Sequence, residues 1–277
     1  MEDAPSGSYQ SEVDAIIEEL VPIIRALPIG RYAISIGGSH GKRRFDELSD
    51  IDFRLFCDET VPYSEGPGEW QALRDAIARW AARGRMIDGC WVRNIAEMNE
   101  KLDAWLGGNA EPEPILWTLW GYYLPTDLAN QYVIEDPYGI IAGWHARLAV
   151  YPPALKQAVL RKHLEILRYW RDDYHYENKA KRGDPVFLAS MAAHLVHSLI
   201  QVLFALNETY YSGDGHNLSY LAGFRIVPPG FAEAVGRVLY PPPSSTRYTD
   251  QRQELLCLIA AVEELATPEV VEQGNHG

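Results

Sequence analysis

The feature that most constrains the fold is a pair of predicted strands joined by a turn of small residues. Residues 31–36 (Arg-Tyr-Ala-Ile-Ser-Ile) form an apolar run that ends at Gly37-Gly38-Ser39. About ten residues later, a second apolar run begins with Asp50-Ile51-Asp52 and continues to Phe56. Side chains at i and i+2 of a strand lie on one face, so we expect Asp50 and Asp52 to point together.

Two neighbouring carboxylates repel each other unless a cation lies between them. Mg²⁺ is bound in proteins by one or two carboxylates and completes its shell with water and phosphate oxygens. Glycine in a turn lets the backbone N–H groups approach an anion closely. The turn and the two carboxylates together therefore predict a site for a metal ion and a nucleotide.

This pattern resembles that of the nucleotidyltransferases of the DNA polymerase β superfamily. Their motif is an apolar residue, Gly, Gly or Ser, a spacer, and then Asp-apolar-Asp-apolar. The corresponding residues are Ile36-Gly37-Gly38-Ser39 and Asp50-Ile51-Asp52-Phe53. The resemblance implies that Asp50 and Asp52 are catalytic ligands of two Mg²⁺ ions. It also implies that Gly37, Gly38 and Ser39 bind the phosphates of a nucleoside triphosphate.

The resemblance also implies a third acidic residue, on the strand beside the Asp-x-Asp strand. We expect that strand in residues 87–95, but its centre carries Arg93 and Asn94. Asp88 is our candidate for the third catalytic carboxylate, although Asp88-Gly89 is also typical of a hairpin turn, so residues 85–95 form either a hairpin or a bulged strand. Glu97 is a second candidate, and a base from elsewhere or no third carboxylate are the remaining alternatives.

Hydrophobic periodicity predicts the remaining elements. Residues 11–27 and 70–82 are predicted helices, so residues 1–150 are expected to form a small mixed sheet with helices on one face. The resemblance implies that this is a nucleotidyltransferase-like domain. Pro152-Pro153 marks the boundary to a helical bundle over residues 151–277. The fold class is therefore α+β. The remaining predictions are a helix over residues 113–123, an extended link over 132–137, and bundle helices over 154–176, 185–211, 230–240 and 249–266.

This layout resembles two-domain small-molecule nucleotidyltransferases of the aminoglycoside and lincosamide group, in which a helical domain closes over the nucleotide. Residues 204–218 are similar to the junction between helix and loop in those domains. Many relatives carry a phosphate-binding Lys there, whereas this chain has His216-Asn217. The departure argues against phosphate binding by this loop.

The net charge of −13 disfavours a nucleic acid as substrate, because binding to its backbone normally needs a basic surface. An acidic protein would instead attract a cationic small molecule. The N-terminus does not resemble a signal peptide, and no apolar run reaches the length of a membrane span, so we expect a cytoplasmic location and no membrane partner.

The sequence thus predicts an Mg²⁺-dependent nucleotidyltransferase that transfers a nucleoside monophosphate to a hydroxyl group of a small molecule. ATP is the first choice of co-substrate, and an aminoglycoside-like antibiotic is the first choice of acceptor. Two alternatives stay open. One is a degenerate member that binds nucleotide as a regulatory module, and the other is an enzyme that modifies protein or RNA, as a toxin would.

Overall fold

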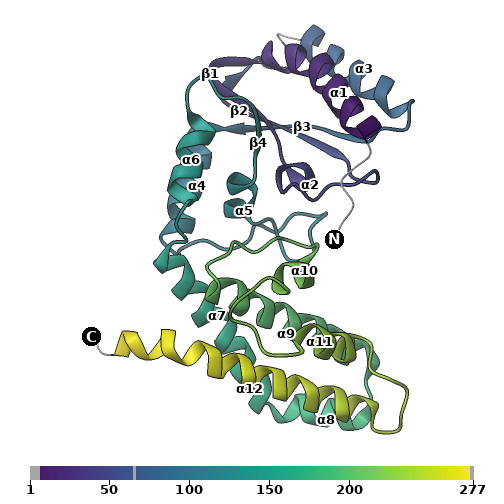
Figure 1. The fold of residues 1–277 in the computed structure, drawn as a ribbon, viewed down its shortest axis with the longest axis vertical. Coiled ribbons are helices and arrows are strands. Elements are labelled where there is room, and N and C mark those ends of the chain that lie inside the picture. The colour runs from purple at the N-terminus through teal and green to yellow at the C-terminus, as the bar shows by residue number, and fades with distance from the viewer. Residues whose placement is uncertain (1–6, 65–66, 275–277) are drawn as a thin grey trace. The chain divides into compact units, whose positions relative to one another are not determined.

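A four-stranded mixed sheet contains the two strands and the turn described above (Figure 1). β1 (Pro28–Ile36) runs antiparallel to β2 (Ile51–Thr60), and the short helix α2 (Gly38–Gly41) lies in the connection between them. β3 (Ile87–Asn94) pairs in parallel with β2, and β4 (Tyr132–Glu135) pairs antiparallel with β1. The strand order is therefore β3-β2-β1-β4, with the two predicted strands at the centre.

The computed structural model describes residues 7–64 and 67–274, and the chain forms two compact units. The first unit consists of Met1–Trp105 and Leu124–Val150, and it contains the sheet. The second unit consists of Leu106–Tyr123 and Tyr151–Gly277. The α+β class is confirmed: a mixed sheet with helices is followed by a helical C-terminal region.

One face of the sheet packs against α1 (Gly7–Arg25) and α3 (Pro67–Ala81), which lie side by side in Figure 1. Alternate residues of the central strands are buried on this face: Ile34, Ile36, Ile51, Phe53 and Leu55. Burying each such side chain contributes about 1.5–3 kcal/mol. Because side chains alternate along a strand, Ser35, Asp52 and Arg54 are left on the opposite face.

The opposite face is also covered by helices, over part of its length, so the prediction of helices on one face only is wrong. α6 (Ile140–Leu148) places Trp144 edge-on against Phe56 of β2, with ring centroids 4.8 Å apart. After α5 (Leu124–Ala129), Gln131 accepts a hydrogen bond from Ser35 of β1 at 2.7 Å. The physical reason is that β2 carries a large aromatic side chain on this face, which needs its own cover.

One further prediction about the sheet is corrected by the structure, and one pair of alternatives is decided. The segment expected as an extended link over residues 132–137 contains β4, a strand too short to show a clear alternation. Residues 87–94 form one strand parallel to β2, so the hairpin alternative at Asp88-Gly89 is wrong and the bulged strand is confirmed.

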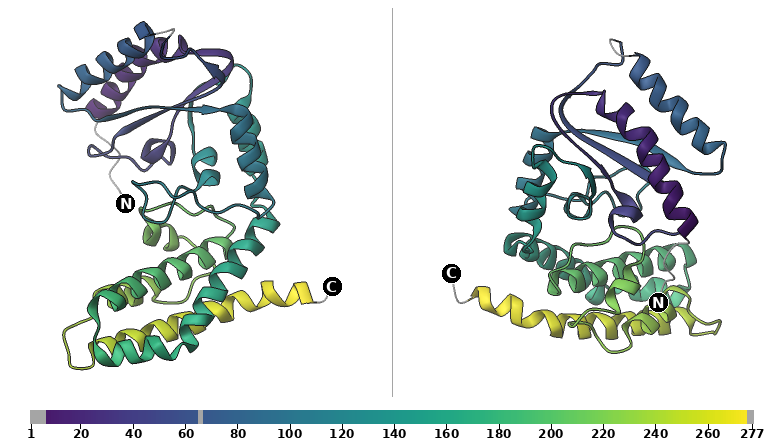
Figure 2. Two further views of the ribbon diagram at one scale, coloured as in Figure 1. Left: turned by 180° about the vertical axis from the view of Figure 1, so that it is seen from behind. Right: turned by 45° about the horizontal axis from the view of Figure 1, so that its top comes forward.

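The second unit contains three long helices: α7 (Pro153–Asp172), α9 (Pro185–Leu206) and α12 (Arg247–Gly274). α9 packs against both of the others, as the two views of Figure 2 show. α7 and α9 are antiparallel, because Trp170 contacts Phe187 near one end while His163 bonds to Ser198 further along. Three shorter helices complete the unit: α8 (Tyr174–Arg182), α10 (Asn217–Leu221) and α11 (Phe231–Leu239).

Three helix predictions in this unit are wrong in detail. The helix expected over residues 185–211 ends at Leu206, because Asn207 caps it: the Asn207 side chain donates to the carbonyl oxygen of Leu203. The helix expected over residues 154–176 ends at Asp172, because extended Asp173 accepts a hydrogen bond from the Tyr176 N–H and begins α8. The helix expected over residues 113–123 is instead a loop closed by an antiparallel bridge between Glu113 and Tyr122. The loop needs Gly121, whose φ is +87°.

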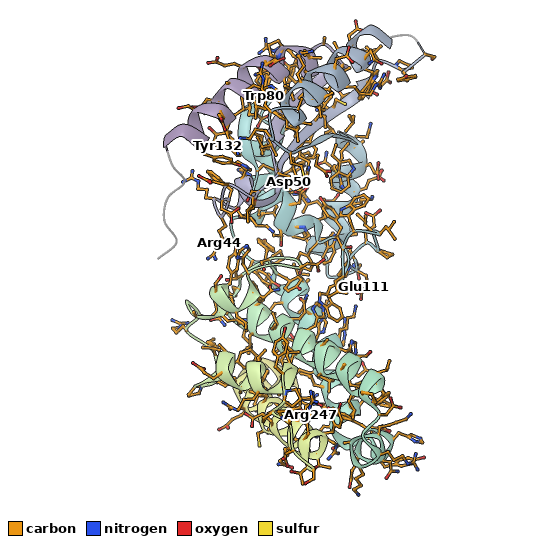
Figure 3. All side chains as sticks on the ribbon, turned by 90° about the vertical axis from the view of Figure 1, so that its right-hand side faces the viewer. Arg44, Asp50, Trp80, Glu111, Tyr132 and Arg247 are labelled. Atoms are coloured by element: carbon orange, nitrogen blue, oxygen red, sulfur yellow. The ribbon has the colours of Figure 1, made fainter. Side chains whose placement is uncertain are left out.

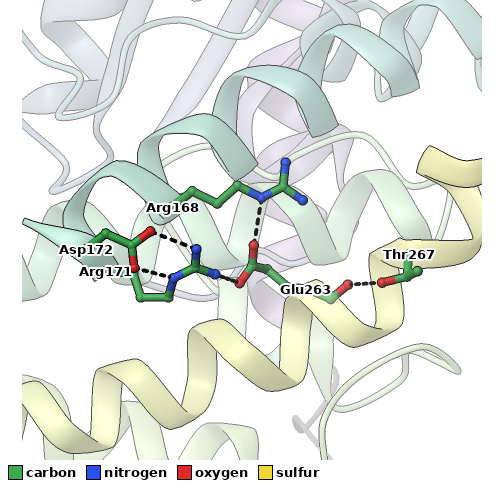
Figure 4. A network of polar contacts seen from close by, with 5 residues as sticks. All are labelled: Arg168, Arg171, Asp172, Glu263 and Thr267. Carbon is green, nitrogen blue, oxygen red and sulfur yellow. Dashed lines mark hydrogen bonds and ion pairs between the residues drawn. The ribbon is translucent and has the colours of Figure 1, made fainter. Parts of the chain in front are cut away.

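Glu263 of α12 connects that helix to α7 (Figure 4). Its carboxylate accepts a hydrogen bond from Arg168 at 2.7 Å and another from Arg171 at 2.5 Å. The side chain of Glu263 is only 15% exposed, so these contacts are less screened than surface ion pairs. They fix the position of α12 along α7.

α9 is the one helix in the described part of the chain with the length and apolarity of a membrane span. In its most apolar window, 67% of the residues are buried within the structure. Its apolar surface is therefore used for packing against its neighbours in the second unit, mainly α7 and α12.

The buried His163 and the half-buried His197 of this unit predict that the protein loses stability in acid. Burial, reinforced by neighbouring histidines and Lys162, lowers the pKa of His163 and of His197 from 6.5 to about 3. Between these values the unfolded chain binds more protons, so stability falls as the pH drops from 6.5 towards 3. The slope is at most about 1.4 kcal/mol per pH unit for each histidine.

The variant His197→Gln tests this expectation, because glutamine retains a polar group near the Tyr211 hydroxyl, which lies 3.5 Å from His197 Nδ1. Urea unfolding followed by tryptophan fluorescence at several pH values between 5 and 7.5 measures the slope. We expect a shallower dependence in the variant than in the wild type. Identical slopes would contradict the assignment.

Candidate functional site

The Gly37-Gly38-Ser39 turn is built against Asp52. The Gly37 N–H donates to the Asp52 carbonyl oxygen at 2.9 Å. Gly38 has a φ of +59°, and a Cβ atom added to it would lie 2.0 Å from Asp52 Oδ2. Both the left-handed backbone and the close approach therefore require glycine at this position. The turn and the second carboxylate of the Asp-x-Asp pair form one structural unit.

Replacing Gly38 with Ala is expected to destabilise the chain by about 1–2 kcal/mol from backbone strain alone and to displace the Asp52 carboxylate. Gly143→Ala in α6 is a matched control, because no atom lies within 4 Å of the added Cβ. As a replacement inside a helix, it should instead stabilise by about 0.5–1 kcal/mol. Urea denaturation measures both, and a Gly38→Ala variant as stable as the wild type would show that this reading of the turn is wrong.

Ser39 lies in this turn with an unsatisfied hydroxyl. Its Oγ atom is buried and has no hydrogen-bond partner among the described residues. The next residue, His40, anchors the turn: its ring stacks on Phe45 with centroids 4.2 Å apart and bonds to the Tyr9 hydroxyl at 3.2 Å. Burial lowers the pKa of His40, which favours its neutral form. The turn thus holds a buried donor without a partner, and a phosphate oxygen bound here would satisfy it once the side chain turned towards the surface.

The loop before β2 fixes the position of Asp50. The Asp46 N–H donates to Ser49 Oγ, and the Ser49 hydroxyl donates to Asp46 Oδ1, each at 3.0 Å. The Ile51 N–H donates to the carbonyl oxygen of Met86 at 3.1 Å, which ties the start of β2 to the chain that enters β3. Asp50 therefore leaves a closed turn directly beside β3.

A β-bulge brings Asp88 to the same place. Between two successive residue pairs, β2 advances by two residues while β3 advances by three, from Ile87 to Cys90. The pair Asp88-Gly89 thus stands opposite Asp52 alone, and Gly89 has a φ of +99°. The extra residue resets the alternation, so Ile87 and Cys90 both pack on the core face while Asp88 lies with Asp52.

Asp50, Asp52 and Asp88 form one cluster. Each offers a carboxylate oxygen, and these atoms lie within 4.8 Å of one another. Asp50 and Asp52 are half-buried and Asp88 is exposed, so the cluster opens to solvent. Figure 3 labels Asp50, and also Trp80 of α3, which belongs to the core on the other face of the sheet. Three convergent carboxylates form the donor set that a hard divalent cation prefers, so the residues fit Mg²⁺.

Burial raises the pKa of Asp52, the guanidinium of Arg54 lowers it, and the charges of Asp50 and Asp88 raise it further. The charged form of Asp52 is therefore less favourable than that of a free carboxylate while no cation is present, and a bound divalent cation would stabilise it. The electrostatics and the geometry of the cluster are therefore both those of a cation site.

Sequence reasoning missed two charged residues beside the cluster. Arg54 follows Asp52 by two residues and lies on the same face of β2, so strand alternation could have identified it. Asp127 lies on α5, and its Oδ2 atom is 3.7 Å from Arg54 Nε. No local pattern links Asp127 to β2, because the contact depends on the path of the chain between them.

Glu97, the second candidate for the third carboxylate, lies outside the cluster. It occupies the first turn of α4 (Ile95–Leu106), where its backbone N–H bonds to Asn94 Oδ1. Its carboxylate pairs with Lys101 at 2.8 Å on the same helix. Among the described residues, Asp88 is the carboxylate that joins the Asp-x-Asp pair.

Comparison with known families gives one match. Residues 126–214 match the model of a family described as a domain of unknown function, DUF4037. The matched segment includes Asp127 and α9 but not the three clustered aspartates. No curated protein shows significant sequence similarity to the chain.

Proposed function

We propose that this chain is an Mg²⁺-dependent nucleotidyltransferase of the DNA polymerase β superfamily. It transfers a nucleoside monophosphate, with AMP from ATP as the first choice, to a hydroxyl group of a small molecule. The observation that carries the proposal is the convergence of Asp50, Asp52 and Asp88 beside a glycine turn that contacts Asp52 directly. The resemblance of the two motifs to that superfamily supports the same reading.

In this proposal the turn and the carboxylates have separate roles. The backbone of Gly37 and Gly38 binds the outer phosphates, because glycine permits close approach, and Ser39 joins them when its buried hydroxyl turns towards the ligand. Asp50, Asp52 and Asp88 hold the metal, which supplies charge neutralisation at the phosphates and activates the attacking hydroxyl.

The reaction balances without another reagent. The acceptor oxygen forms a bond to the α-phosphorus, the bond from that phosphorus to the bridging oxygen of the β-phosphate breaks, and pyrophosphate leaves. The hydroxyl proton passes to water or to a carboxylate of the cluster. Asp88 is the candidate for this role, because it is the most exposed of the three aspartates.

The net charge of −13 supports a small cationic acceptor over a polynucleotide. An aminoglycoside-like compound carries both the hydroxyl groups and the positive charge that this proposal requires. The proposed reaction consumes a nucleoside triphosphate. We therefore propose a cytoplasmic location, where this co-substrate is supplied.

The test is transfer of label from ATP labelled at the α-phosphate, with Mg²⁺ and a cell extract, followed by separation of small molecules from macromolecules. Label in the small-molecule fraction is the expected result. Label on protein or RNA would replace this proposal with a macromolecular target. Nucleotide binding without label transfer, and without pyrophosphate release over a panel of hydroxyl compounds, would instead indicate a regulatory nucleotide-binding module.

A further inference from the structure

Arg54 is a buried cation inside an acidic site. Its side chain is only 8% exposed, and its Nη1 atom lies 3.6 Å from Asp52 Oδ1. On the other side, its Nε atom lies 3.7 Å from Oδ2 of Asp127, whose side chain is also 8% exposed. Arg54 therefore bridges a carboxylate of the candidate metal cluster and a carboxylate of α5.

The guanidinium of Arg54 is packed between Trp91 and the glycine turn. The group lies over the ring of Trp91 on β3, with Cζ 4.8 Å from the ring centroid. A Cβ atom on Gly37 would approach Cζ, Nε and Nη2 to 3.1 Å, so the guanidinium packs directly against the glycine turn. A side chain at position 37 would therefore crowd Arg54. This is a second reason for glycine there, besides the access of phosphate to the backbone.

Arg54 and the glycine turn lie beside the two oxygens of Asp52. Oδ1 faces the guanidinium of Arg54, whereas Oδ2 faces Gly38, where an added Cβ would lie only 2.0 Å away. The positive charge beside Oδ1 and the close packing beside Oδ2 restrict the rotation of this carboxylate. A metal ligand gains affinity when its orientation is fixed before the ion arrives, as partners of metal ligands commonly achieve.

We propose that Arg54 is a positioning residue that holds Asp52 in its ligand orientation, and that Asp127 acts through Arg54 by anchoring its guanidinium. The inference rests on the proposed function in one respect, because it takes the aspartate cluster to bind a divalent cation. In this role Arg54 acts on the metal only through Asp52.

The direction in which metal affinity changes when Arg54 is removed distinguishes a positioning role from a purely electrostatic one. If Arg54 only competed with the cation for Asp52, its removal would tighten metal binding, because the site would become more negative. If Arg54 positions Asp52, its removal weakens metal binding even though the site becomes more negative. Loss of a partner that orients a metal ligand typically weakens affinity about 10- to 100-fold.

The experiment measures Mn²⁺ binding to the full chain by calorimetry, with no nucleotide present. The variants are Arg54→Gln, Asp127→Asn and the double variant, with Arg31→Gln as a matched control. Arg31 pairs with Asp58 at the surface of the same sheet, at 2.9 Å, so its loss should leave Mn²⁺ affinity unchanged. The double variant removes Arg54 and Asp127 together, so neither is left buried without the other, and it reports on the site even where a single variant fails to fold.

We expect each single variant to bind Mn²⁺ at least about tenfold more weakly than the wild type. The double variant should bind no more weakly than Arg54→Gln, because Asp127 acts through Arg54. Unchanged or tighter binding in Arg54→Gln, or additive effects in the double variant, would overturn the inference while the proposed function stands. A wild type that does not bind Mn²⁺ would overturn both.

Discussion

Asp52→Asn is expected to lower the rate of nucleotidyl transfer by roughly a thousandfold, since losing about 4 kcal/mol of metal-dependent charge stabilisation has that effect. Asparagine keeps the shape of the side chain and removes only its charge. Because its size is nearly that of aspartate, it also fits against Gly38, which packs so closely on Asp52 that an added Cβ would lie 2.0 Å from Oδ2. Asp50→Asn should have a similar effect, because both residues belong to one cluster. The measurement is transfer of labelled nucleotide to the acceptor fraction.

Asp58→Asn is the matched control for these variants. Asp58 lies on the same strand, outside the cluster, and its carboxylate bonds to the backbone and the guanidinium of Arg31. Loss of a surface ion pair costs about 0–1 kcal/mol of stability, so transfer should be unaffected. Equal rates of transfer for Asp52→Asn and Asp58→Asn would show that the cluster does not take part in the reaction.

Asp88→Asn is expected to weaken Mn²⁺ binding at least about tenfold and to lower the rate of transfer, because the cluster loses one of its three carboxylates. Glu97→Gln is the comparison, since Glu97 pairs with Lys101 at the start of α4. That variant should lose only the small contribution of an exposed pair on a helix, about 0.3–0.5 kcal/mol.

The two variants decide which residue is the third carboxylate. Calorimetry gives the Mn²⁺ affinity, and thermal unfolding shows that both variants fold. An Asp88→Asn variant with wild-type affinity would mean that the bulge at Gly89 serves the packing of β3 alone. A large effect of Glu97→Gln would mean that the site in solution differs from the cluster described above.

The centre of the first unit was predictable because its signals are local. An apolar run that ends at glycine predicts a strand and a turn, and alternation places Asp50 and Asp52 on one face without knowledge of their partners. The third position was ambiguous because Asp-Gly favours both a hairpin turn and a bulge. Only the pairing of β3 with β2 distinguishes these, and that pairing involves residues far apart in the chain.

Other features were missed for the same physical reason. β4 has only four residues, too few to show a period, and becomes a strand because β1 offers it an edge. The contact of Arg54 with Asp127 depends on where α5 lies in the fold. Periodicity did identify α9, whereas the end of α7 depends on one capping residue, Asp173, inside a run that is otherwise typical of a helix.

The central claim is that the aspartate cluster and the glycine turn together form a site for a metal ion and a nucleotide. The most direct test is calorimetric titration with a non-hydrolysable ATP analogue, with and without Mg²⁺. The proteins compared are the wild type and a double variant, Asp50→Asn with Asp52→Asn. We predict Mg²⁺-dependent binding to the wild type that the double variant loses. Equal, Mg²⁺-dependent affinity in the two proteins would contradict the claim.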